Sequence, residues 1–218
     1  MTSRADIIDG SQAIGRKYGL IYTEKCGWID LGHANPEGAL TLWNQIKNEE
    51  SIESENIPND SFRIAYRQMM GRKNLVMVGI QKKYDIKKQL SESEKKSVAL
   101  SIFLDVSHAF ESLQAGFPFN LVTDSGFSGE DLVSDLIGFY RAVNPGGNYI
   151  RLCQPVRKEI ALKIWDTYGP VGNNKNHSTS PYLYPIPPNT GRITRGRLPP
   201  FLNTIKPLKE GELYQVVH

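Results

Sequence analysis

The spacing of apolar and polar residues along the chain predicts a mainly helical protein with one small β-hairpin. Apolar residues three and four positions apart, which mark one buried helix face, predict helices over residues 9–17, 36–46, 93–115, 130–140 and 156–168. Polar caps precede several of these segments, and Gly or Pro follows them. Residues 62–70 alternate and residues 75–80 are rich in β-formers, so with the turn G-R-K-N between them they predict a hairpin near 62–84.

The length of 218 residues predicts one domain, with fold class α+β and mostly α. Residues 1–169 are expected to form a helical catalytic body. Eight of the 13 prolines lie between Pro170 and Pro207, so residues 170–218 are expected to form an extended, irregular Pro-rich tail packed on that body.

Composition excludes several classes of protein. A hydrophobic content of 39% and a charged content of 22% are ordinary for a soluble globular chain. No apolar run approaches the ~20 residues of a membrane span, and the N-terminus lacks the apolar core of a signal peptide. We therefore expect synthesis in the cytoplasm, with another system carrying the protein if it works elsewhere. The two cysteines, Cys26 and Cys153, make no disulfide framework; they could pair if the protein is exported, but free buried thiols are the expected state. No zinc spacing is visible, so neither metal nor cofactor is predicted.

Charge is distributed unevenly along the chain. Residues 97–140 hold six acids and no Lys or Arg, whereas residues 141–218 hold eleven basic residues against four acids. This asymmetry suits an anionic polymer held near carboxylates, either nucleic acid or cell-wall glycan. The basic residues form no runs and no nucleic-acid motif is present, so nucleic acid is not the expected partner.

One segment concentrates potential chemistry: from Thr23 to His33 it reads T-E-K-C-G-W-I-D-L-G-H. Glu24 beside Trp28 could be a proton donor, because burial against an aromatic ring raises a carboxyl pKa. Asp30 could then stay ionised, while His33 orients a carboxylate or relays a proton, and Trp28 binds substrate. The alternative is structural, with Trp28 in the core and Asp30 capping a turn.

The helix expected over residues 93–115 carries a second group of candidates. Its polar positions include Asp105, His108 and Glu111, and no basic residue follows Lys96 within the helix. Such a face is typical of a polar cleft wall, although a stripe facing water has the same pattern. Glycoside hydrolysis usually needs two carboxyl groups, so Asp105 and Glu111 are predicted to be catalytic and His108 to bind substrate.

Other residues offer competing chemistry. Cys26 with a histidine permits a thiol nucleophile, although a lone cysteine in an apolar context is more often inert packing. Glu130, Asp131 and Asp135 are explained as a helix cap and an exposed helix face, and are not predicted to be catalytic. His177 is expected in an exposed loop.

Two blocks of sequence, residues 19–33 and residues 127–138, resemble a bacterial family of unknown function, many of whose members look like envelope lipoproteins. The family pattern of glycine, aromatic, isoleucine, Asp, two residues and His is matched by Gly27, Trp28, Ile29, Asp30 and His33. In the family pattern, this motif is followed by a helix with two acids six positions apart and then by the segment F-S-x-E-D-L. The family pattern does not require cysteine at position 26. This weakens the thiol mechanism and favours a mechanism that uses the carboxylates and His33.

The overall plan is also similar to the lysozyme-like toxins delivered by type VI secretion. That resemblance implies a peptidoglycan hydrolase, a muramidase-like glycosidase acting as an antibacterial effector in the periplasm of a rival cell. An immunity protein and a secretion-system carrier would then be partners. Two alternatives remain open: a cysteine amidase or peptidase using Cys26, and a non-enzymatic envelope-binding module.

Overall fold

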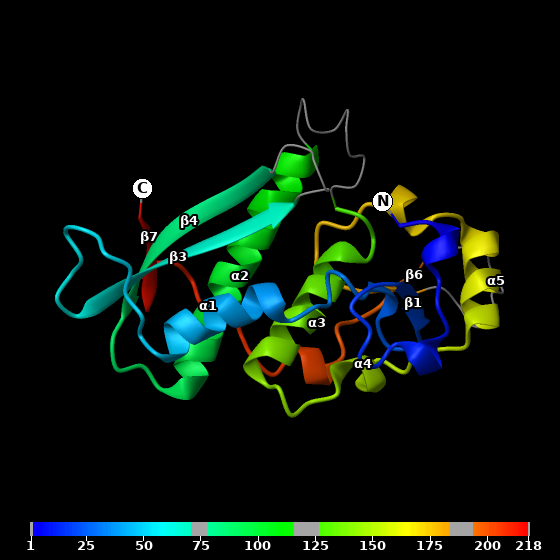
Figure 1. Cartoon of the computed structure of the whole chain (residues 1–218), viewed down its shortest axis with the longest axis horizontal. Coiled ribbons are helices and arrows are strands. Elements are labelled where there is room, and N and C mark those ends of the chain that lie inside the picture. Colours follow the sequence, from blue (N-terminus) through cyan, green and yellow to red (C-terminus); the bar gives the residue numbers. More distant parts are fainter. Residues whose placement is uncertain (1, 71–77, 116–126, 184–193, 218) are drawn as a thin grey trace. The chain divides into compact units, whose positions relative to one another are not determined.

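The computed structural model describes residues 2–70, 78–115, 127–183 and 194–217 (Figure 1). It confirms a mixed α+β architecture. Its helices are α1 (Glu37–Lys47), α2 (Glu92–Ala115), α3 (Asp131–Val143), α4 (Tyr149–Leu152) and α5 (Lys158–Tyr168). Short 3-10 turns occupy Arg4–Asp6, Gly10–Gln12, Val171–Asn173 and Pro200–Leu202. Among the described residues, no helix is both long enough and apolar enough to cross a bilayer.

The strands extend beyond the single predicted hairpin. That hairpin is confirmed: β3 (Ser61–Met70) and β4 (Val78–Lys87) are antiparallel, with Ser61 opposite Lys87. Its predicted turn, residues 71–74, lies outside the described residues. Strand β7 (Tyr214–Val217) adds to the free edge of β4, in the predicted tail. Two further pairs were not predicted, namely β1 (Leu20–Thr23) with β2 (Gly27–Asp30) and β5 (Tyr182–Leu183) with β6 (Thr194–Arg195).

The predicted helix over residues 9–17 is wrong. Only one 3-10 turn forms there, and Gly15 has a φ of 81°, which lies in the left-handed region. The backbone of Gly10 packs so closely on residues 155–156 that a Cβ would lie 2.3 Å from the Val156 carbonyl oxygen. Glycine weakens a helix and allows such close backbone contact, so tertiary packing decided this segment.

The chain divides into two compact units. Unit 1 contains residues 1–36 and 111–203, and unit 2 contains residues 37–110 and 204–218. In unit 1, α5 packs on β1, and Trp28 forms edge-to-face contacts with Trp165 and Tyr22 at centroid distances of 5.7 and 5.3 Å. These rings belong to one buried apolar cluster. The core of unit 1 therefore fixes the strand that leads toward His33.

In unit 2, α2 runs along the β3–β4 hairpin (Figure 1), and Tyr66 of β3 faces Phe103 of α2 at 6.3 Å between ring centroids. The predicted start of α2 is confirmed by Ser91, whose backbone N–H and hydroxyl both donate to the Glu94 carboxylate. The apolar helix face predicted from the sequence is buried as expected, at Val98, Ala99, Ile102, Phe103, Val106 and Phe110.

Unit 2 also encloses an ion pair. Arg63 of β3 donates to both carboxylate oxygens of Asp85 on β4, at 2.6 and 2.7 Å, and also to Ser54 Oγ at 2.9 Å. The side chains of Arg63 and Asp85 are only 8% and 15% exposed. Removing one partner of such a pair leaves a charge without compensation in a largely dry environment.

We therefore expect Asp85→Asn to lower the thermal unfolding midpoint by about 8 °C. The matched control is Asp166→Asn, because the Arg4–Asp166 pair has the same chemistry but both side chains are 54% exposed. Exposed pairs contribute little, so this control should leave the midpoint nearly unchanged. Thermal unfolding followed by circular dichroism measures both variants, and equal midpoints would contradict the prediction.

Candidate functional site

A tight turn after β2 positions His33. The backbone N–H of Ala34 donates to the Asp30 carbonyl at 2.9 Å, and the N–H of Gly32 donates to Asp30 Oδ1 at 2.7 Å. The Asp30 backbone N–H donates to Ser134 Oγ of α3 at 3.0 Å. The Asp30 carboxylate therefore caps the turn, which is the structural alternative predicted for it.

Helix α3 packs directly on this turn. A Cβ at Gly138 would lie 2.9 Å from the His33 carbonyl oxygen and 3.0 Å from that of Asn35, both backbone atoms. The Arg141 guanidinium donates to the Ala34 carbonyl. Only glycine allows this approach without a shift, so the contact fixes His33 over one face of α3.

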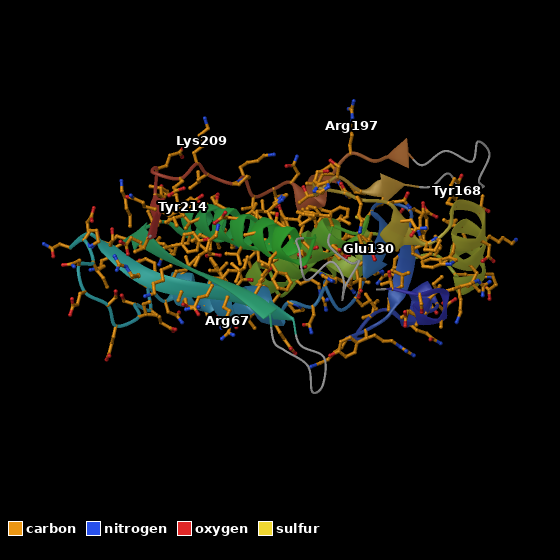
Figure 2. The ribbon with its side chains drawn as sticks, turned by 90° about the horizontal axis from the view of Figure 1, so that it is seen from above. Arg67, Glu130, Tyr168, Arg197, Lys209 and Tyr214 are labelled. Atoms are coloured by element: carbon orange, nitrogen blue, oxygen red, sulfur yellow. The ribbon has the colours of Figure 1, made fainter. Side chains whose placement is uncertain are left out.

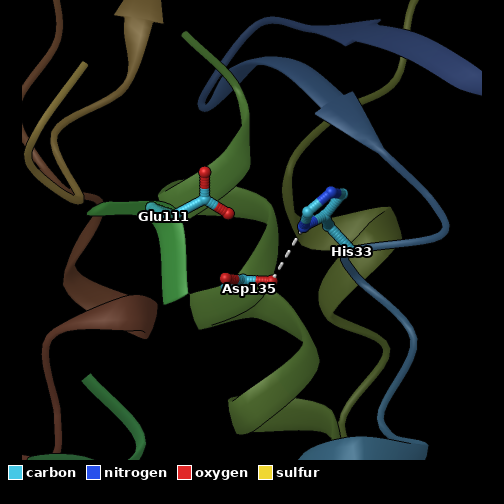
Figure 3. Close-up of side chains that lie close together, drawn as sticks. All are labelled: His33, Glu111 and Asp135. Carbon is cyan, nitrogen blue, oxygen red and sulfur yellow. Dashed lines mark hydrogen bonds and ion pairs between the residues drawn. The ribbon is translucent and has the colours of Figure 1, made fainter. Parts of the chain in front are cut away.

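That face of α3 carries two carboxylates. His33 Nδ1 lies 3.1 Å from Asp135 Oδ1, and Nε2 lies 3.8 Å from Asp131 Oδ1. Figure 3 shows Glu111 directed toward the same space, and the ligand atoms of His33, Glu111 and Asp135 all lie within 4.8 Å of one another. Three segments far apart in sequence thus meet at one imidazole. We call His33, Glu111, Asp131 and Asp135 the carboxylate–histidine cluster.

The cluster is mostly buried and opens to solvent through its imidazole. Glu111 is 1% exposed, whereas the His33 side chain is 35% exposed. Glu111 accepts a hydrogen bond from the Phe127 backbone N–H at 2.8 Å, and Asp131 accepts one from Ser128 N–H at 2.8 Å. Both carboxyl groups are therefore held in place by the chain that precedes α3.

Burial and mutual repulsion set the proton affinities in the cluster. Burial, followed by the charge of Asp131, raises the pKa of Glu111 to about 8. Burial raises the pKa of Asp131 as well, against the opposing charge of His33. For His33, burial disfavours the charged form, but Asp131 and Asp135 outweigh it and raise its pKa well above the usual value. These shifts favour the neutral form of the Glu111 carboxyl group and the charged form of the His33 imidazole.

Glu130 extends the negative character of this region. It is 2% exposed, and its Oε1 accepts from the Thr2 hydroxyl at 2.9 Å (Figure 2 labels its position). Its buried Oε2 has no hydrogen-bond partner among the described residues. Burial, followed by the charge of Asp131, raises the pKa of Glu130 to about 7.

The donor set also has the composition of a metal site. One imidazole and two carboxylates, from His33, Glu111 and Asp135, converge within the spacing given above. Zinc in catalytic sites is commonly held by three such ligands with a fourth position left for water. These residues could hold a divalent cation, although the sequence predicted none.

Of the predicted catalytic residues, the structure brings His33 and Glu111 together and places Asp30 in the adjoining turn, where its charge acts on His33. Asp105 belongs to unit 2 instead. Both of its oxygens bind Lys82, at 2.8 and 2.9 Å, and Oδ2 accepts from the Tyr84 hydroxyl at 2.6 Å. The described contacts of Asp105 are thus those of an ion pair between α2 and β4, and they do not place it with His33 and Glu111.

The structure also bears on three other candidates. Trp28, expected to bind substrate, is 2% exposed and packs in the core of unit 1. Glu24 is exposed in the β1–β2 turn and is not buried against Trp28. Cys26 is fully buried, so its thiol is not presented to a substrate. His108 is half-buried in unit 2, and its predicted contact with substrate remains a prediction.

Sequence reasoning missed Asp131 and Asp135, which it explained as cap and surface. Two signals could have found them. They are four positions apart, which places both on one helix face, and they lie in the long acidic segment that has no basic residue. Buried carboxylates without a nearby Lys or Arg are unusual in a helix that only packs.

No family model matches the chain, and no similar protein was found among curated proteins or solved structures. The functional argument therefore rests on the cluster and on the sequence features described above.

Proposed function

We propose that the protein is a hydrolase of the peptidoglycan glycan, a muramidase-like glycosidase whose catalytic centre is the carboxylate–histidine cluster. The single observation that carries this proposal is the position of His33, half-exposed, against Asp135, Asp131 and the deeply buried Glu111. Glycoside hydrolysis uses carboxyl groups that lie in contrasting environments around the scissile bond.

The environment of each group suggests its role. Glu111 is the proton reservoir, because burial keeps its carboxyl protonated at neutral pH. Since Glu111 itself is inaccessible, His33 contacts the substrate and relays the proton to the glycosidic oxygen as the C–O bond breaks. Water then adds to the anomeric carbon, and its proton returns through His33 to Glu111. Asp135 orients the imidazole through Nδ1, and Asp30, whose Oδ1 caps the adjoining turn, is the carboxylate assigned to the developing positive charge on the sugar.

The choice of substrate rests on the charge pattern and on the resemblances. Basic residues in the last quarter of the chain, such as Arg197 and Lys209, extend their side chains away from the ribbon (Figure 2) and suit an anionic cell-wall polymer. The resemblance to an envelope-associated family and to lysozyme-like effectors supports the same substrate. An antibacterial effector acting in the periplasm of a target cell, with a secretion-system carrier and an immunity protein, is part of this proposal.

The test is digestion of purified peptidoglycan, with products separated and identified by mass. Released disaccharide–peptide fragments with new reducing ends are the expected result. Glu24→Gln is the matched control for changes in the cluster, since Glu24 is an exposed carboxyl. Cut peptides on an intact glycan, or no product at all, would overturn the glycosidase assignment.

A second candidate function is metal-dependent hydrolysis of the same polymer, at an amide instead of a glycosidic bond. The convergence of the His33, Glu111 and Asp135 donor atoms favours it. A bound zinc ion would supply an activated water. In that case Glu111 would be an ionised ligand and could not hold a proton, so the two mechanisms exclude each other.

Chelation separates the two mechanisms. Acid–base glycan cleavage should be unchanged after dialysis against EDTA, within about twofold, because no step in it uses a metal. Loss of activity on chelation, restored by added Zn²⁺ and accompanied by one zinc per chain in elemental analysis, would replace the first mechanism with the second. His33→Ala should then abolish zinc binding, whereas Glu24→Gln should retain it.

A further inference from the structure

Two cysteine side chains meet in the interior of unit 1. Cys26 Sγ and Cys153 Sγ are 3.3 Å apart, and both residues are fully buried. Cys26 lies in the β1–β2 turn, where its backbone N–H donates to Thr23 Oγ1 at 3.1 Å. Cys153 directly follows α4. Residues 127 positions apart in sequence thus present their thiols to each other.

Backbone hydrogen bonds hold the two cysteines at this separation. Glu24 N–H donates to the Gln154 carbonyl at 3.0 Å, and Lys25 N–H donates to the Cys153 carbonyl at 3.1 Å. Val156 N–H donates to the Tyr22 carbonyl at 3.0 Å. These bonds join the two chain segments on both sides of the thiols. Closing the gap to the S–S bond length of about 2.05 Å is therefore a matter of small side-chain rotations.

We propose that Cys26 and Cys153 are a site of covalent modification, forming an intramolecular disulfide when the protein folds in an oxidising compartment. The oxidant is a low-molecular-weight disulfide or a disulfide-donating oxidoreductase. One Cys thiolate attacks its S–S bond, and the second thiolate resolves the mixed disulfide. Two thiols of the protein lose two protons and two electrons, and the donor is released as two thiols.

The timing of the reaction follows from the surroundings of the thiols. The hydrogen bond with Cys26, together with burial, raises the pKa of Cys153, so the nucleophilic thiolate is scarce once the protein has folded. The disulfide therefore forms during folding or on local opening. It would close a loop containing more than half of the chain and would tie down the hairpin that leads to His33. This inference is independent of the proposed hydrolysis.

The test compares protein refolded in a buffer of reduced and oxidised glutathione with protein refolded in dithiothreitol. Each sample is unfolded, alkylated with N-ethylmaleimide and weighed. After oxidative refolding we expect no label, a mass about 2 Da below that of the reduced chain, and a proteolytic fragment pair joining residues 26 and 153. The thermal midpoint should rise by about 10 °C, as expected for a long closed loop, and dithiothreitol should reverse the rise.

Cys26→Ser and Cys153→Ser provide controls, since neither should show a midpoint that depends on the redox buffer. If these variants do not fold, the wild-type comparison with and without dithiothreitol still decides the question. Full labelling of both cysteines after oxidative refolding, or disulfide-linked dimers in place of the internal bond, would overturn the inference. Either result leaves the proposed hydrolase activity untouched, because that activity does not involve the thiols.

Discussion

Replacing His33 with alanine is expected to lower the rate of glycan cleavage by at least about 100-fold while the protein remains folded. The imidazole is the only member of the carboxylate–histidine cluster with substantial exposure, so without it the buried carboxyl groups cannot exchange a proton with a bound sugar. Initial rates on purified peptidoglycan measure the effect. Glu24→Gln should keep the wild-type rate.

Asp135→Asn gives a sharper version of the same test. The Asp135 charge and hydrogen bond raise the pKa of His33, so their loss should lower it. Because the imidazole acts in its protonated form, the alkaline limb of the pH–rate profile should move to lower pH. A folded His33→Ala protein with full activity, or an unmoved alkaline limb in Asp135→Asn, would contradict the role given to His33.

Replacing Glu111 with glutamine is expected to remove a loss of stability that the wild-type protein undergoes at alkaline pH. The folded pKa of Glu111 is about 8, above its ordinary value of 4.5. A pKa that is higher in the folded than in the unfolded state means that the native state binds the proton more tightly than the unfolded chain does. The stability from that proton is fully present below about pH 4.5 and is lost as pH rises through about 8.

The difference between the two pKa values corresponds to a contribution to the free energy of unfolding of about 5 kcal/mol. Glutamine has nearly the same shape, can still accept from the Phe127 N–H, and has no proton to lose. Urea unfolding at about pH 5 and about pH 9 should therefore show a larger drop for the wild type than for Glu111→Gln. The control Glu24→Gln should follow the wild type, and identical drops in all three proteins would refute the prediction.

Local patterns predicted the elements that carry the cluster. The helices α1, α2, α3 and α5 were expected within a few residues of their observed ends, because capping residues and apolar faces act over one or two turns. The β3–β4 hairpin followed from alternation. The failure over residues 9–17 has a local cause and a distant one: the glycines weaken a helix, and residues 155–156 require Gly10 for contact.

The geometry of α2 explains why one candidate pair does not lie together. Asp105 and Glu111 are six residues apart, which at about 100° per residue places them about 120° apart around the helix axis. The two side chains therefore cannot both lie on one narrow face of α2. The structure accordingly gives Asp105 to Lys82 on β4, and Glu111 to unit 1 beside His33.

The sequence by itself determined most of the helices, the main hairpin and the candidacy of His33 and Glu111, because these depend on side-chain periodicity and residue type within short windows. Only the tertiary structure decided that Asp131 and Asp135 complete the cluster and that Trp28 belongs to the core. Which helix and turn surfaces come into contact depends on packing between distant segments, such as the contact of the His33 turn with Gly138. Burial then sets the proton affinity of each carboxyl group, and burial is a property that no local window of sequence contains.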